Sequence, residues 1–144
     1  MEMARIKNWV VWLVVLGAAG CAKSICPDGM TLDATRSKPG QSAFCQSASD
    51  KSRAAWIELS PGGAPSQPLQ ICPFLGGRPG GPYLAFHPSG ARRLEGRYES
   101  GKKVGLWTQL APDGRKVADG KYRDGQLIEG APVGFQATCE SVAW

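Results

Sequence analysis

Few side chains in this sequence could carry acid–base chemistry. His87 is the only histidine, and it stands directly before Pro88 in a stretch that predicts a turn. Asp113 and Asp124 also fall at predicted turns, where a carboxylate commonly hydrogen-bonds the nearby backbone. We expect structural roles for them and no enzyme, because the sequence has no Gly-x-Ser-x-Gly, His-Glu-x-x-His or phosphate-binding glycine motif. The alternative is a small envelope hydrolase or carbohydrate-processing protein in which these three side chains meet in a cleft.

Five cysteines carry the remaining reactive chemistry. With Cys21 set aside, the chain keeps an even number, Cys26, Cys45, Cys72 and Cys139, which favours two disulfides in an oxidising compartment. Three pairings are possible. The turn-rich segment between Cys26 and Cys45 has little apolar material to order it, so we expect these two to pair and leave Cys72 with Cys139. A zinc site is the competing interpretation, but the sequence has no Cys-x-x-Cys pair, and we predict neither a metal nor a cofactor.

Residues 1–20 have the layout of an export signal. Arg5 and Lys7 supply positive charge, and Val10 to Ala19 form an uncharged apolar run that ends in small residues before Cys21. A membrane-spanning helix needs about 20 apolar residues, and this run is shorter. We therefore predict a cleaved signal peptide, with a permanent transmembrane anchor as the weaker alternative.

The end of this segment resembles the bacterial lipobox, in which small residues precede a cysteine that receives lipid. It reads Leu16-Gly17-Ala18-Ala19-Gly20-Cys21, and the lipobox prefers leucine where this chain has Ala18. By resemblance, Cys21 carries acyl chains such as palmitate, which hold the chain on a membrane because each buried methylene contributes about 0.8 kcal/mol. The absence of aspartate after the cysteine favours the outer membrane over the inner membrane. Ordinary cleavage, with Cys21 left as a plain thiol, is the alternative.

The composition limits the mature chain to one small domain. Removing 20 of the 144 residues leaves 124, which suffice for a modest core and exclude a large enzyme fold. Glycine (19) and proline (11) make up about a fifth of the chain, which indicates frequent turns rather than disorder. The mature part has 15 basic and 11 acidic residues, and this weakly basic surface does not predict nucleic-acid binding.

Beyond residue 77 the sequence repeats with a constant offset of 24 residues. The stretch from Tyr83 to Gly101 aligns with the stretch from Trp107 to Gly125, and the aromatic, Pro-x-Gly, Gly-x-Tyr and final glycine positions coincide. Weaker copies cover Trp56 to Gly63 and Ile71 to Gly77, so three units and a partial fourth are the best count. A period of this length is typical of a stacked array in which neighbouring units complete one another's core.

Within each unit the apolar positions alternate, which predicts half-buried β-strands. The pattern recurs in both copies: Leu94, Gly96 and Tyr98, then Ala118, Gly120 and Tyr122. The Pro-x-Gly turns close pairs of strands into hairpins. We expect the strand glycines Gly96 and Gly120 to make room for a ring, that of Tyr83 or Trp107, to lie over the backbone. The sequence therefore predicts an all-β array of hairpins.

The two clear units resemble the bacterial variant of MORN repeats. They read GPYLAFHPSGARRLEGRYESGKKVGLW and GLWTQLAPDGRKVADGKYRDGQLIEG, with an aromatic strand, a turn and then Gly-x-Tyr-x-x-Gly. The resemblance covers residues 78–130, is weak over 54–77 and is absent from 21–50, and Gly130 comes one residue late against Gly105. It implies a single elongated sheet used for contacts with membranes or proteins. Some bacterial members are named as antitoxins, so a toxin-neutralising protein is a further alternative, at odds with an exported chain.

We expect a non-enzymatic lipoprotein of the cell envelope that acts as a binding or scaffold module through this sheet. Its expected parts are a signal peptide (1–20), a tether and disulfide-stapled N-terminal cap (21–50), a degenerate first repeat (51–77), MORN-like repeats (78–130) and a C-terminal tail (131–144). The candidates for its binding surface are the repeat aromatics Trp56, Tyr83, Tyr98, Trp107 and Tyr122. Besides the membrane that holds its anchor, the expected partner is an envelope protein, lipid or polysaccharide.

Three basic pairs recur near the predicted hairpin ends, at 92–93, 102–103 and 115–116. One interpretation is a cationic stripe that touches anionic lipid or polysaccharide. The other is a set of solvated strand ends whose charge discourages pairing between sheet edges.

Overall fold

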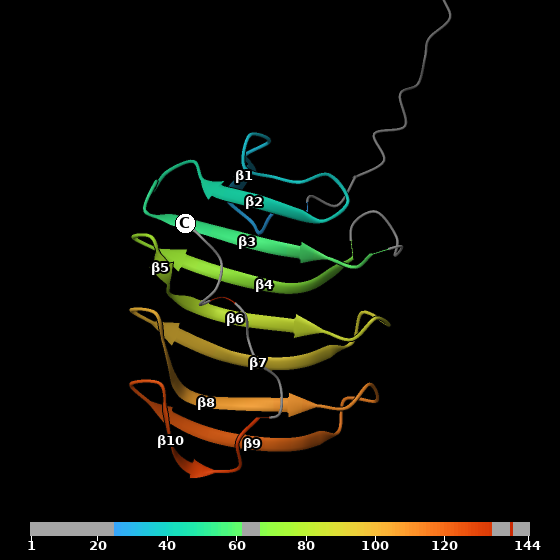
Figure 1. Cartoon of the computed structure of the whole chain (residues 1–144), viewed down its shortest axis with the longest axis vertical. Helices are drawn as coiled ribbons and strands as arrows, with labels where there is room; N and C mark the ends of the chain where they lie inside the picture. The colour runs from blue at the N-terminus through green and yellow to red at the C-terminus, as the bar shows by residue number, and fades with distance from the viewer. Residues whose placement is uncertain (1–24, 62–66, 134–138, 140–144) are drawn as a thin grey trace, which may run out of the picture.

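The computed structural model describes residues 25–61, 67–133 and 139. These residues contain no α-helix and form one open antiparallel sheet of ten strands (Figure 1). The strands follow one another in the order β1-β2-β3-β4-β6-β7-β8-β9-β10, and the short β5 pairs with β4. They are β1 (Met30–Leu32), β2 (Ser42–Ser47), β3 (Arg53–Leu59), β4 (Pro68–Leu75), β5 (Arg78–Pro79), β6 (Gly81–Phe86), β7 (Arg92–Glu99), β8 (Lys102–Leu110), β9 (Lys116–Arg123) and β10 (Gln126–Gly130). The predicted all-β array of hairpins is confirmed.

Two kinds of hairpin turn occupy the two sides of the sheet. The turns at 87–91 and 111–115 contain the Pro-x-Gly sequences, and in each the first amide donates to the last carbonyl at 2.8 Å. The two-residue turns at 76–77, 100–101 and 124–125 have positive φ at both residues, between 49° and 84°. Type I′ turns require this, and their twist matches that of the strands. We name these the proline-turn side and the glycine-turn side, which lie right and left in Figure 1.

Side chains alternate between the two faces of the sheet. Leu94 and Tyr98 on β7 are buried, whereas Arg97 between them is exposed. Tyr83 and Trp107 share the face of Tyr98, because the register places them opposite the strand glycines of that face. We name this the aromatic face and the opposite one the open face.

Each end of the described chain covers part of one face and is held there by a disulfide. Cys26 is bonded to Cys45 and packs with Ile57 on the open face over β2, β3 and β4. Cys139 is bonded to Cys72 and belongs to the core of the aromatic face. Both predicted pairings are confirmed, and they indicate an oxidising compartment outside the cytoplasm.

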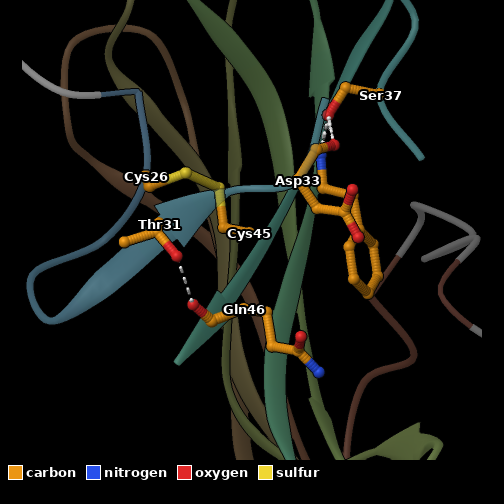
Figure 2. The surroundings of a disulfide bond; sticks show 7 residues. Cys26, Thr31, Asp33, Ser37, Cys45 and Gln46 are labelled. Atoms are coloured by element: carbon orange, nitrogen blue, oxygen red, sulfur yellow. Dashed lines mark hydrogen bonds between the residues drawn. A yellow bond between two sulfur atoms is a disulfide. The ribbon is translucent and has the colours of Figure 1, made fainter. Parts of the chain in front are cut away.

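The N-terminal cap expected from the sequence is part of the sheet rather than a separate unit. β2 pairs with β3 over five positions, with Phe44 opposite Trp56, and its first four residues are buried because both faces of this strand are covered. Next to the Cys26–Cys45 disulfide, the Ser37 hydroxyl donates to the Asp33 carbonyl at 2.6 Å (Figure 2). The same hydroxyl accepts the Phe44 amide at 2.9 Å, which holds the preceding loop against β2.

One extra residue explains the late glycine of the last unit. The register of β10 on β9 shifts between Leu127 and Glu129, which leaves Ile128 as a bulge. Gly130 nevertheless has a positive φ of 82°, as Gly105 does at 66°. The hairpin pattern therefore continues through β10.

The predicted signal peptide (1–20), the lipid-attachment residue Cys21 and most of the 131–144 tail lie outside the described residues. Within the described residues, no helix has the length and apolar character needed to cross a membrane.

Candidate binding surface

The three central aromatic side chains of the repeats form the core of the sheet. Trp107 and Tyr83 are 0% exposed and Tyr98 is 1% exposed. Tyr83 stacks on Trp107 with ring centroids 5.4 Å apart, and Tyr98 meets Trp107 edge-on at 5.1 Å. They are not available to a partner, which corrects the prediction that they form a binding surface. The other two candidates, Trp56 and Tyr122, are half-buried and pack against the same cluster.

The physical reason for this correction is that the rings pack against one another and against two residues beyond β10, Val133 and Cys139. Val133 is buried in the aromatic cluster, and its amide donates to the Tyr122 hydroxyl at 3.4 Å. Cys139 reaches the same cluster through its disulfide to Cys72 on β4. The segment expected to be a tail thus contributes two residues that cover the aromatic rings.

The two strand glycines are crowded for different reasons. A Cβ atom at Gly96 would lie 2.6 Å from Cε3 of Trp107 and closer still to two other indole atoms, so the ring lies directly on the backbone as predicted. At Gly120 the added atom would meet the Ala131 carbonyl and would lie 2.7 Å from Cδ1 of Leu127. The prediction of a ring over glycine is therefore confirmed at Gly96, whereas Gly120 makes room mainly for the chain that returns after β10.

A buried polar chain lies beside the aromatic cluster. The Tyr83 hydroxyl donates to Gln70 Oε1 at 2.8 Å, and Gln70 Nε2 donates to Glu58 Oε2 at 2.6 Å. Burial raises the pKa of Tyr83 well above its ordinary value, and the Glu58 carboxylate adds to the rise. The indole Nε1 of Trp107 is buried and has no hydrogen-bond acceptor among the described residues. The hydrogen bonds of Tyr83 and Gln70 help to specify the core, and the Glu58 carboxylate that completes them is half-buried.

The candidate acid–base residues do not meet. His87 Nε2 lies 2.9 Å from the Leu110 carbonyl and links one proline turn to the next hairpin. Asp113 accepts the Arg115 amide at 2.9 Å within its own turn, and Asp124 lies on the opposite, glycine-turn side. No three His, Cys, Asp or Glu side chains lie together as metal ligands in the part of the chain that the structure describes.

The three basic pairs do not form one stripe. Near the proline-turn side, Arg92 pairs with Glu95 at 3.3 Å and Lys116 with Asp119 at 2.6 Å. The lysine pair that begins β8 lies on the glycine-turn side, and the second of these lysines places its Nζ 4.9 Å from the ring centre of Trp107. The cations thus divide between the two sides of the sheet and between its two faces.

Large apolar side chains are exposed on the part of the open face that the N-terminal segment leaves uncovered. Leu75, Leu106 and Val117 are 55%, 61% and 53% exposed. Two of them lie directly opposite a cation on the neighbouring strand, Leu75 opposite Arg78 and Leu106 opposite Lys121. They stand on three different strands, β4, β8 and β9, and offer separate apolar contact points on this face.

Three cations of this surface have no carboxylate partner in the part of the chain that the structure describes. Arg78, Arg97 and Lys121 are exposed and form no ion pair with any residue that the structure describes. They differ in this respect from Arg92 and Lys116, whose carboxylate partners lie three residues along the same strand. The open face between the N-terminal segment and β9 is therefore the candidate binding surface.

Sequence reasoning missed this surface because it concentrated on the aromatic residues. The alternation of side chains along β8 already indicated this surface. If Trp107 faces a core, then Leu106 must face the other side of a sheet, and no second apolar layer follows in the sequence to cover it. A scan of the chain against protein-family models found no match, and a search of curated proteins found none either.

Proposed function

We propose that this chain is a non-enzymatic lipoprotein of the cell envelope that binds a partner with the open face of its hairpin sheet. The observation that carries the proposal is the contrast between the two faces. The rings of the aromatic face are buried in one cluster with Val133 and Cys139, whereas Leu75, Leu106 and Val117 are exposed on the other face. A single sheet that closes only one face leaves the other as an extended area for contact.

The proposed address is the outer membrane, with the chain held by lipid on Cys21. The two disulfides support a compartment outside the cytoplasm. The lipid anchor rests on the resemblance of residues 16–21 to a lipobox. Such an anchor would hold the sheet near a membrane and would leave its faces free for a partner in the envelope.

Neither alternative gains support from the arrangement of the residues. A hydrolase would need His87 and the turn aspartates in one cleft, and the imidazole is instead hydrogen-bonded to the Leu110 carbonyl. A toxin-neutralising protein that acts in the cytoplasm would not keep the Cys26–Cys45 disulfide, because the cytoplasm is reducing.

Photo-crosslinking in living cells tests the binding role. A photoreactive amino acid at Leu106 reports on the open face, and the same amino acid at Asp113, an exposed turn residue, is the matched control. We expect a discrete adduct from Leu106 and none from Asp113. Equal adducts from both positions, or no adduct from Leu106, would refute the open face as the binding surface.

A further inference from the structure

A hollow of about 290 Å³ opens on the open face near the glycine-turn side. Two arginines line it, Arg78 from β5 and Arg97 from β7, together with the exposed side chain of Leu75. The type I′ turn at 76–77 returns the chain so that Arg78 lies opposite Leu75. Part of the lining is bare backbone, because Gly80 and Gly81 carry no side chain there. The glycine-rich stretch 76–81 thus helps to build a recess that two arginines line.

The chemistry of this recess favours an oxyanion. Neither guanidinium has an ion-pair partner among the described residues. A guanidinium offers a planar fork of N–H donors that fits a carboxylate with two parallel hydrogen bonds. Two guanidinium groups beside one recess, with the apolar side chain of Leu75 next to them, are suited to a carboxylate on a carbon framework.

A further cation of the open face, Lys121, lies beyond the hollow on β9. Lys121 follows Arg97 by 24 residues, on β9 rather than β7, so two strand spacings of about 10 Å in total separate their backbones. Lys121 lies opposite the exposed Leu106, as Arg78 lies opposite the exposed Leu75. The 24-residue repeat thus accounts for the cations at 97 and 121, whereas the residues opposite Arg97 are Pro82 and Val104 rather than a leucine.

The open face also carries carboxylates, and they distinguish between possible ligands. Glu99 lines the hollow itself. Glu95 on β7 and Asp119 on β9 both lie opposite Thr108 of β8. A continuous anionic surface such as a membrane would be pressed against these carboxylates as well as the cations. A linear polymer with spaced charges can follow the cations alone, and the C–H faces of its rings can pack on the leucines.

We propose that the open face binds a linear acidic polysaccharide that crosses the strands. One carboxylate of the polymer occupies the hollow between Arg78 and Arg97, and the next cations met are Lys102 on β8 and Lys121 on β9. Leu75 and Leu106 contact the sugar rings. The inference rests on the proposed role of the chain as a binding module and names the chemical class of its ligand.

Binding of hyaluronan oligosaccharides to the full chain in non-ionic detergent tests this assignment. Hyaluronan alternates a sugar that carries a carboxylate with one that does not, and a neutral chitin oligosaccharide of equal length is the control ligand. We expect Arg78→Gln and Arg97→Gln each to weaken hyaluronan binding about tenfold. Arg115→Gln removes the same charge from the proline-turn side and should leave the affinity unchanged. Glu99→Gln should strengthen binding, because it removes a carboxylate from the hollow.

Binding to lipid vesicles distinguishes a polysaccharide ligand from a lipid headgroup. The lipid anchor inserts into any bilayer, so vesicles with phosphatidylglycerol are compared with vesicles of phosphatidylcholine alone, each with the same variants. A preference for phosphatidylglycerol that depends on Arg78 and Arg97, without hyaluronan binding, would overturn the polysaccharide in favour of a lipid headgroup. Equal binding of hyaluronan and chitin, an equal loss in Arg115→Gln, or no hyaluronan binding would also overturn it. Since a protein adduct from photoreactive Leu106 would survive all of these results, failure of this inference is distinguishable from failure of the binding role.

Discussion

Trp107→Ala is the sharpest perturbation of the aromatic face. Trp107 is the largest fully buried side chain of the described residues and contacts the rings of both Tyr83 and Tyr98. Replacing a buried tryptophan with alanine typically costs about 3–5 kcal/mol, because the transfer free energy is lost and a cavity remains. Thr108 is the next residue and is half-buried on the open face, so Thr108→Ala should cost less than about 1 kcal/mol.

Thermal unfolding of the oxidised chain measures the difference. For a chain of this length, each kcal/mol lowers the Tm by about 3–5 °C. Trp107→Ala should therefore lower the Tm by more than about 10 °C, and Thr108→Ala by less than about 5 °C. Equal shifts for the two variants would refute the assignment of Trp107 to the core and of Thr108 to the other face.

A double-mutant cycle isolates the contact between Trp107 and Gly96. In the natural chain, Gly96→Ala places a methyl group against the indole, and such overpacking costs about 1–3 kcal/mol. In the Trp107→Ala background the collision is absent, so Gly96→Ala should cost nothing or should stabilise the strand, since alanine orders the backbone better than glycine. An unchanged cost in that background would show that the ring does not lie on Gly96.

Two further predictions concern the disulfides and the buried phenol. The Cys72–Cys139 disulfide closes a separation of 67 residues and the Cys26–Cys45 disulfide one of 19. Replacing both cysteines of a bond with alanine should lower the free energy of unfolding by about 4 kcal/mol for the first and about 3 kcal/mol for the second. The reverse order in urea unfolding would contradict this expectation. The pKa of Tyr83 is raised in the folded state, so its neutral phenol contributes fully to stability below the unfolded pKa of about 10, and this contribution is lost as the pH rises above about 10. Above pH 10, the Tm of Tyr83→Phe should therefore fall less steeply with pH than the Tm of the natural chain. Equal slopes would argue against a buried Tyr83 phenol.

The local structure of the repeats could be predicted because each turn is encoded by its own residues. The Pro-x-Gly sequences form the turns at 87–91 and 111–115. Ser100-Gly101 and Asp124-Gly125 form the two-residue turns, because serine, aspartate and glycine tolerate the positive φ that these turns require. The alternation of Leu94, Gly96 and Tyr98 likewise assigned the buried face of β7. The extra Ile128 delays the last glycine by one residue, and a bulge accommodates it without ending the sheet.

The candidate binding surface could not be predicted in the same way, because it depends on which face of the sheet is covered by residues outside the strands. A pattern of alternating residues defines two faces without saying which is closed. The pairing of Cys72 with Cys139 contained this information, since a disulfide from β4 to the chain end requires that end to return over the sheet. The recess between Arg78 and Arg97 depends on the path of the chain after the 76–77 turn, and no local preference of those residues predicts it.

The claim that this chain is a lipid-anchored protein of the cell envelope is tested most directly by its intact mass. The protein would be purified from the native membrane fraction and compared with a Cys21→Ser variant. Our account predicts a mature chain that begins at Cys21 and carries added acyl mass, with that mass absent from the variant. An unmodified chain that retains residues 1–20 and resides in the cytoplasm would contradict the account.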